Sequence, residues 1–212
     1  MRRSVQDGGR HGAALVTALL IFFGLLSTPA SAGPDTWKLD PAHTQIRFSW
    51  DHLGVSWQSG TFTEIYGSLE FSPTMPTAGS VEATAMVASL HTGVPALDKI
   101  LKSSDYFDAK KYSRIMFRSS AVRALGPKTG EIDGQLTLRG ITKPITLNVI
   151  WNYTGEHPLA PFNPVHRGQW VSGFTARATI KRSDWGISRS APLVSDEIQI
   201  EINAEFLQLN RD

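Results

Sequence analysis

The strongest constraint on the fold is an alternation of apolar and polar residues from Gly130 to Trp151. The residues that share its apolar face are Ile132, Gly134, Leu136, Leu138, Ile145, Leu147, Val149 and Trp151. Period-two alternation on both sides of Arg139-Gly140 indicates an antiparallel hairpin with one buried face. A one-residue slip would expose that whole face, so the register is well specified. Pro144 is expected at the start of the second strand, where a missing N–H is tolerated.

The same alternation recurs along most of the chain. We expect further strands at about 44–50, 59–71, 81–90, 114–121, 170–181 and 198–206. The segment 96–112 differs, because Leu97, Ile100 and Leu101 have helical spacing and predict a short helical insert. About eight evenly spaced strands with little helix predict an all-β fold, an antiparallel barrel or sandwich.

The face made of Val81, Ala83, Ala85 and Val87 consists of small side chains. Because protein interiors are normally close-packed, such a face requires either a closely packed layer above it or a cavity. The sequence leaves both alternatives open.

Residues 1–32 have the features of a secretory signal peptide. Arg2, Arg3 and Arg10 are basic, 13–26 is an apolar run, and Ala30-Ser31-Ala32 is a small-x-small cleavage site. The apolar run is shorter than the roughly 20 residues that span a bilayer. We therefore predict cleavage after Ala32 and one soluble, exported domain over 33–212.

Removal of this leader leaves 18 of the 21 basic and 18 of the 19 acidic residues, so the mature chain has no formal net charge. Without a cluster of Lys and Arg, nucleic acid is excluded as a partner. The chain has no cysteine, so an exported form must be stable through packing and hydrogen bonding alone.

Four sequence blocks resemble the YceI-like polyisoprenoid-binding family, over about 37–206. They are Asp40–Phe48 (D-x-x-H-[ST]-x-I-x-F), His52–Gly54 with Gly60–Phe62 (H-L-G and G-x-F), Gly134–Pro144 (G-x-L-T-x-x-G-[VI]-T-K-P) and Arg182–Ile187 (R-S-D-[FW]-G-I). The resemblance implies an eight-stranded antiparallel lipocalin-like β-barrel whose lumen holds a long isoprenoid chain. It also implies export to the periplasm and no catalytic residues common to the family.

One block departs from the family pattern. Around the helical insert, Thr92-Gly93 and Ser104–Phe107 match, but Leu97 and Ile100 stand where the family tends to have Arg and His. This difference does not affect the prediction of an apolar lumen. It does affect which ligand head group can be inferred from the family pattern.

A barrel of eight strands is about the size that holds one slender ligand. The predicted lumen lining consists of inward-facing apolar residues: Phe48, Trp50, Phe62, Leu69, Phe71, Val87, Phe117, Leu136, Leu138, Trp151, Phe174 and Phe206. Each residue alone is compatible with ordinary core packing, and the hypothesis concerns the set. The expected ligand is an isoprenoid lipid, either a quinone or a polyprenyl compound, with no other cofactor.

Four polar residues are candidates for contacts with a head group or at the barrel mouth: His43, His52, Arg182 and Asp184. Hydrogen bonding within turns is the alternative role for each of them. No H-x-H or H-E-x-x-H pair occurs, so no metal site is predicted. Ser183 lacks a G-x-S-x-G setting, and no set of nucleophile, base and oxyanion donors can be assembled.

The sequence thus predicts an exported, non-catalytic carrier of an isoprenoid lipid. One alternative is a hydrolase or other enzyme acting on an amphipathic substrate, with His43 or His52 as base. Another is a structural or interaction barrel with a solid core. A transient contact with a membrane or membrane protein and a homodimer are compatible with each of these hypotheses.

Overall fold

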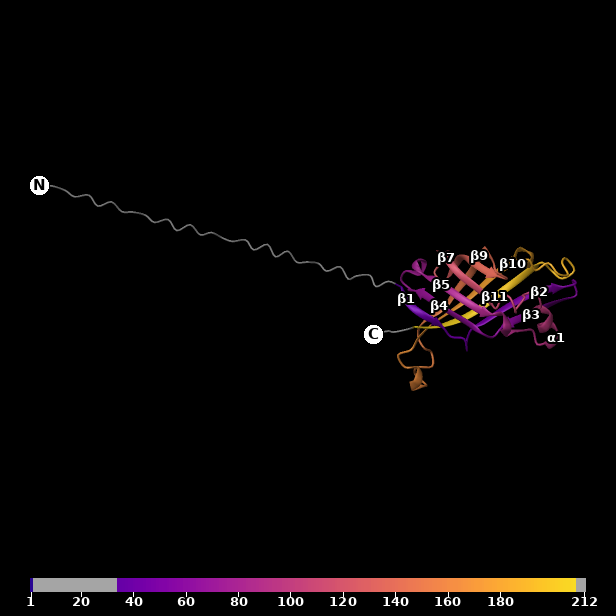
Figure 1. The fold of residues 1–212 in the computed structure, drawn as a ribbon. Coiled ribbons are helices and arrows are strands. Elements are labelled where there is room, and N and C mark those ends of the chain that lie inside the picture. Colours follow the sequence, from indigo (N-terminus) through magenta and orange to yellow (C-terminus); the bar gives the residue numbers. More distant parts are fainter. Residues whose placement is uncertain (2–33, 209–212) are drawn as a thin grey trace. The chain divides into compact units, whose positions relative to one another are not determined.

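The alternating segments form antiparallel strands that close into a barrel (Figure 1). A computed structural model gives this fold and describes Met1 and residues 34–208. The predicted signal peptide therefore lies, apart from Met1, outside the described residues. Among the described residues, no helix is long and apolar enough to cross a membrane.

The strands are β1 (Asp35–Leu39), β2 (Gln45–His52), β3 (Ser56–Phe62), β4 (Ile65–Phe71), β5 (Ser80–Met86), β6 (Leu90–His91), β7 (Arg114–Ala124), β8 (Thr129–Leu138), β9 (Ile141–Glu156), β10 (Trp170–Lys181) and β11 (Glu197–Gln208). One α-helix, α1 (Pro95–Leu101), and four 3₁₀ turns, η1 (Pro76–Ala78), η2 (Val87–Ser89), η3 (Pro164–His166) and η4 (Arg182–Trp185), complete the elements of 34–208.

Eight strands form the closed barrel, in the order β1-β4-β5-β7-β8-β9-β10-β11, and the pairing of β1 with β11 closes it. On the edge that does not pair with β10, strand β11 has two partners in succession, because its residues 206–208 pair with β1 and its residues 199–203 pair with β2. The β2–β3 hairpin thereby extends one end of the barrel. The predicted all-β, eight-stranded antiparallel barrel with a short helical insert is confirmed.

The central hairpin is β8–β9, with Leu138 opposite Ile141 across the turn Arg139-Gly140. Both turn residues have positive φ, 52° and 71°, as a two-residue type I′ turn requires. The expected position of Pro144 is wrong, because it lies within β9, opposite Gln135. The register of β9 with β10 ends at Asn148, so at Pro144 the missing N–H removes no ladder bond to β10.

The single strand expected at 59–71 is two strands. The chain turns at Thr63-Glu64, where the Ser89 hydroxyl oxygen accepts both backbone N–H groups at 3.2 and 3.0 Å. As a result β3 pairs with β2, and β4 pairs with β1. The Gly67 position is a close approach, since a Cβ there would lie 2.6 Å from the Glu82 carbonyl oxygen.

The helical insert is shorter than predicted. It begins with Pro95 in the first turn and ends at Leu101, and turns follow as far as 111. The apolar stripe also ends at Leu101, and the following Ser103-Ser104-Asp105 favours turns over helix because short polar side chains compete for backbone hydrogen bonds.

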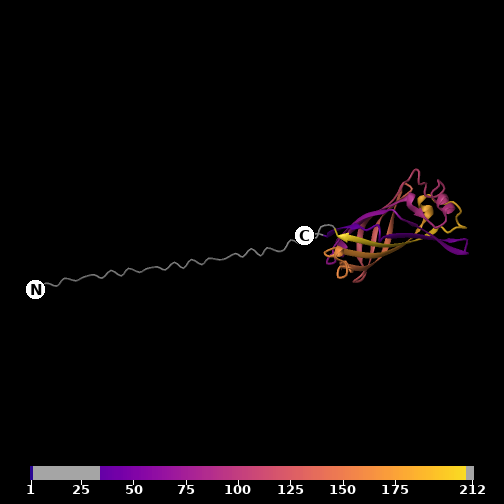
Figure 2. The same cartoon turned by 90° about the horizontal axis from the view of Figure 1, so that it is seen from below.

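The barrel has two distinct ends. The helix end carries the β2–β3 turn (53–55), α1, the β8–β9 turn (139–140) and the segment 182–196. The loop end carries the β4–β5 loop (72–79), the β7–β8 turn (125–128) and the β9–β10 loop (157–169). Figures 1 and 2 show α1 at the same end as the β2–β3 hairpin.

Candidate functional site: an apolar cavity in the barrel lumen

A cavity of about 690 Å³ fills the barrel lumen. Its lining reaches the β7–β8 turn at the loop end, through Pro127 and Lys128, and α1 at the helix end, through Leu97 and Ile100. Cavities that bind small molecules have volumes of about 300–1,000 Å³ and mostly apolar walls. The size and chemistry of this lumen are therefore those of a binding site.

The small residues of β5 make room for this cavity. Val81, Ala83 and Ala85 all line it, which decides between the two alternatives left open for this face. Several inward-facing side chains, such as Ala83, Ile132 and Ile200, are only half-buried although they lie inside the barrel. Empty space lies beside them, so the lumen is not the solid core of the interaction-barrel alternative.

Eleven of the twelve predicted lining residues lie on the cavity wall: Phe48, Trp50, Phe62, Leu69, Phe71, Phe117, Leu136, Leu138, Trp151, Phe174 and Phe206. Contact of these residues with a ligand stays a prediction. The aromatic rings among them pack against one another. Phe71 lies edge-to-face with Trp151 and with Phe174, with centroids 5.3 Å apart in each pair. Phe48 stacks on Trp50, with centroids 5.7 Å apart. Such aromatic pairs hold the wall in a fixed shape.

Val87 is the exception, and its placement on the lumen wall is wrong. It is fully buried in η2 and does not line the cavity. Its N–H donates to the Ser113 carbonyl at 2.9 Å. Because β5 ends at Met86, the alternation that places Ala83 and Ala85 inward no longer applies one residue later.

The sequence prediction also missed part of the wall. Leu97, Ile100 and Leu101 of α1 close the helix end of the lumen, together with Tyr106 and Phe107. The helical spacing of the first three residues predicted an insert that could cover one end of a barrel, but these residues were not among the predicted lumen lining.

Arg182 has mainly structural contacts. Its buried guanidinium donates to four backbone carbonyls at 2.8–2.9 Å, those of Ile187, Arg189, Val194 and Ser195. These bonds hold the segment 186–196 across the helix end. The side chain also reaches the cavity wall, so contact with a ligand head group stays a prediction.

The other polar candidates are divided between the lumen and the outer surface. His52, at the end of β2, lines the cavity and forms a bridge with Val194. Asp184 is half-exposed, does not line the cavity and forms an ion pair with Lys143 at 3.5 Å. The structure therefore brings His52 and Arg182 to the lumen and leaves Asp184 outside it.

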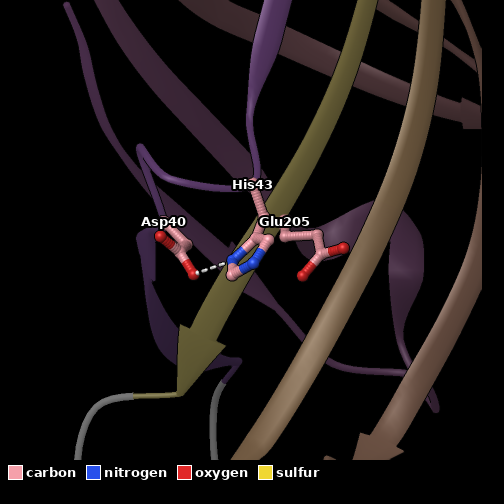
Figure 3. A group of neighbouring side chains, drawn as sticks. All are labelled: Asp40, His43 and Glu205. Atoms are coloured by element: carbon pink, nitrogen blue, oxygen red, sulfur yellow. Dashed lines mark hydrogen bonds and ion pairs between the residues drawn. The ribbon is translucent and has the colours of Figure 1, made fainter. Parts of the chain in front are cut away.

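His43 lies outside the lumen, in the turn that joins β1 to β2. Figure 3 shows its ring between Asp40 and Glu205. The Asp40 carboxylate accepts from His43 Nδ1 at 2.8 Å and from the Ala42 N–H at 2.9 Å. The Asp40 N–H donates to the Glu205 carbonyl at 2.8 Å, which docks the turn on β11.

The charges in this turn shift both ionisable partners. The hydrogen bond to Asp40 raises the pKa of His43 above its ordinary value, and the negative charges of Asp40 and Glu205 act in the same direction. Burial opposes ionisation of Asp40, but the hydrogen bonds from His43 and Ala42 outweigh it and lower the pKa of that carboxyl. Protonated His43 and ionised Asp40 therefore stabilise each other.

Asp40, His43 and Glu205 also offer ligand atoms within 4.8 Å of one another, so this group could hold a metal ion. The sequence prediction of no metal site overlooked this group, because the three residues are brought together only by the pairing of β11 with the β1–β2 turn. The group lies on the outer surface, and its hydrogen bonds are those expected of a structural turn.

Charged residues border the cavity at the loop end. Arg123 and Glu131 contribute to its edge, and their side chains form an ion pair at 2.7 Å on the outer face of the sheet, which Asp133 extends. The hydrogen bond from Arg123 lowers the pKa of Asp133. Lys128, also on the wall, donates to the Asn152 carbonyl at 3.2 Å and lies over the Trp151 ring. The sequence prediction did not include these residues.

Comparison with known proteins supports the resemblance read from the motifs. The family model described as YceI-like domain matches residues 37–206. A protein of Pseudomonas savastanoi pv. phaseolicola named UPF0312 protein is 33% identical over 195 residues, which cover 91% of this chain and 96% of that protein.

Two solved structures share the barrel fold. Burkholderia cenocepacia BcnA has a TM-score of 0.69 at 24% identity, covering 79% of this chain and 98% of that chain. A polyisoprenoid binding domain from Saccharophagus degradans, implicated in plant cell wall breakdown, has a TM-score of 0.57 at 13% identity, covering 82% and 98%. Since the family match spans nearly all of the described barrel, this chain belongs to the YceI-like domain family.

Proposed function

We propose that this protein is an exported, non-catalytic binding and carrier protein for a long isoprenoid lipid, a quinone or a polyprenyl compound. The observation that carries the proposal is the apolar cavity of about 690 Å³ that extends from the β7–β8 turn to α1. The barrel neighbour from Saccharophagus degradans, described as a polyisoprenoid binding domain, agrees with this ligand class.

The energetics of burial favour a long apolar chain. Each methylene group moved from water into an apolar site contributes about 0.8 kcal/mol. Ordering of the flexible chain offsets part of this gain. Affinity is therefore expected to rise with chain length until the lumen is full.

The polar end of the ligand is proposed to lie at the loop end. Arg123, Lys128 and Glu131 border the lumen there. At the helix end His52 also lines the lumen, but the Arg182 guanidinium is already bonded to four backbone carbonyls and the α1 wall is apolar. Polar groups at a pocket fix orientation and add selectivity to an affinity that comes from the apolar wall.

The enzyme alternative has less support. Of the two histidines considered as a base, His43 lies on the outer surface, hydrogen-bonded to Asp40, and His52 alone lines the cavity. An enzyme that uses His52 predicts turnover that His52→Ala abolishes while the fold is kept. The carrier proposal predicts that the bound lipid is recovered chemically unchanged from both the wild type and the His52→Ala variant.

Export rests on the leader-like residues 1–32, and the proposed location is the periplasm. Fractionation of a host that expresses the full chain tests this part separately. The expected product in the periplasmic fraction begins at Gly33, and an uncut chain retained in the cytoplasm would contradict it.

Binding is tested by titrating the ligand-free protein with prenols of increasing length and with quinones. The cavity wall contains Trp50 and Trp151, so the readout is the change in tryptophan fluorescence. We expect saturable binding with one ligand per chain and a Kd that falls with each added isoprene unit. The absence of saturable binding for every length would refute the proposal.

A further inference from the structure

Exposed apolar side chains lie on several elements at the helix end of the barrel. We name this set the apolar rim: Leu53, Val55, Trp57, Val94, Ile100 and Leu193. Val55 is 82% exposed and Leu193 is 72% exposed. We propose that the apolar rim docks the helix end of the barrel onto a bilayer that contains anionic phospholipids. This inference rests on the proposed function, because the bilayer is where an isoprenoid lipid resides.

The apolar rim is continuous with the cavity wall. Ile100 belongs to both, since it is half-exposed on α1 and also lines the lumen. The Leu53 N–H donates to the Leu193 carbonyl at 3.1 Å, which ties the β2–β3 turn to the segment 186–196. The neighbouring residues His52 and Val194 line the cavity. A lipid that passes the apolar rim therefore meets the cavity wall directly, at the apolar residues Ile100 and Val194 beside the polar His52.

The loop end lacks this continuity. Its exposed apolar side chains are Leu125 in the β7–β8 turn and Leu159, Phe162 and Val165 in the β9–β10 loop, and none of them lines the cavity. The residues that border the lumen there include Arg123, Lys128 and Glu131. Exposed apolar residues and an apolar lumen thus adjoin at the helix end.

The chemistry of the apolar rim fits a membrane surface. Its members come from the β2–β3 hairpin, from α1 with the residue before it, and from the segment 186–196. Such separate apolar side chains can enter the boundary between head groups and acyl chains. Trp57 is half-exposed, and tryptophan is enriched at this boundary. Exposed Lys99 stands beside Ile100 and forms no ion pair among residues 34–208, so its charge is available for an anionic head group.

The experiment is flotation of the mature protein with vesicles of phosphatidylglycerol and phosphatidylethanolamine. The test variant is Val55→Ser with Leu193→Ser. The matched control is Phe162→Ser with Val165→Ser, which removes two side chains of similar exposure, 84% and 73%, at the loop end. Burial of an apolar side chain in the bilayer contributes favourable transfer free energy, and the test variant loses two such side chains. We therefore expect its partition constant to be about tenfold lower than that of the wild type. The control should float like the wild type.

Equal loss in both variants, or no loss in the test variant, would overturn the proposal. Light scattering provides a second test. A wild type that is a dimer and a test variant that is a monomer would also overturn the proposal, because a second copy of the chain would then cover the apolar rim. Prenol binding without vesicles is measured on the same proteins. Prenol binding by a wild type that does not float would overturn docking alone, whereas flotation without prenol binding would support docking and refute the carrier function.

Discussion

The substitution Ala83→Trp tests whether the lumen is a cavity that holds a ligand. Ala83 is half-buried on the wall of the cavity, and its partners across the sheet are Gly67 and Phe117. Gly67 has no side chain, so an enlarged residue 83 can extend into the empty lumen. Glu82→Trp is the matched control, because Glu82 is exposed on the outer face of the same strand.

The magnitude follows from the area that the new ring occupies. A tryptophan side chain covers about 150–250 Å². A ligand that loses about 150 Å² of apolar contact loses about 4 kcal/mol at 25 cal/mol per Å². The displaced part of the ligand is no longer ordered, which returns some of this free energy. We therefore expect roughly 100-fold weaker binding of long prenols, about 2.8 kcal/mol.

Two assays measure the consequences of Ala83→Trp. Prenol titration should show the loss for long chains and little change for chains short enough to fit the remaining space. Urea unfolding of the ligand-free protein should show little loss of stability, since the ring fills a void. A solid core would instead impose an overpacking cost of about 1–3 kcal/mol or more. That cost together with unchanged prenol binding would refute the cavity argument.

Three further predictions concern individual side chains. Arg182→Ala leaves four carbonyls without their charged donor, so urea unfolding should show a loss of about 3–5 kcal/mol, and a loss below about 1 kcal/mol would contradict the structural role. The raised pKa of His43 stabilises the fold below about pH 6.5, and this contribution disappears as pH rises through the folded-state pKa. Between pH 6 and 8 the wild type should therefore lose more free energy of unfolding than His43→Gln, by a small amount since His43 is exposed, and equal pH slopes would contradict this. Lys128→Ala should reduce the preference for quinones over prenols of equal length. If Lys128→Ala keeps this preference and His52→Ala loses it, the head group lies at the helix end.

Much of the barrel follows from alternation in the sequence. Ile198, Ile200 and Ile202 of β11 line the lumen, as period-two alternation requires once the sheet closes. Ile132, Leu136 and Leu138 of β8 line it for the same reason. The aromatic wall residues could be predicted for the same reason. Within an unbroken strand, the identity of the inward face is a local property.

Two of the errors arise where a strand is interrupted. Ser89 binds the backbone at Thr63-Glu64 and divides the expected strand 59–71, and the end of β5 at Met86 removes Val87 from the lumen. Neither the hydrogen bonds of Ser89 nor the end of β5 at Met86 is indicated by the local sequence. The cavity beside Ala83 depends on closure of the ring by β1 and β11, and the sequence could not distinguish it from a close-packed layer.

The most direct test of the carrier function is mass spectrometry of an organic extract of the protein after gentle purification from its host. The account predicts close to one isoprenoid lipid per chain in the wild type and in Glu82→Trp, and much less in Ala83→Trp. An extract without isoprenoid, from a protein that also fails to bind added quinones and polyprenols, would contradict the account and leave the cavity without an assigned ligand.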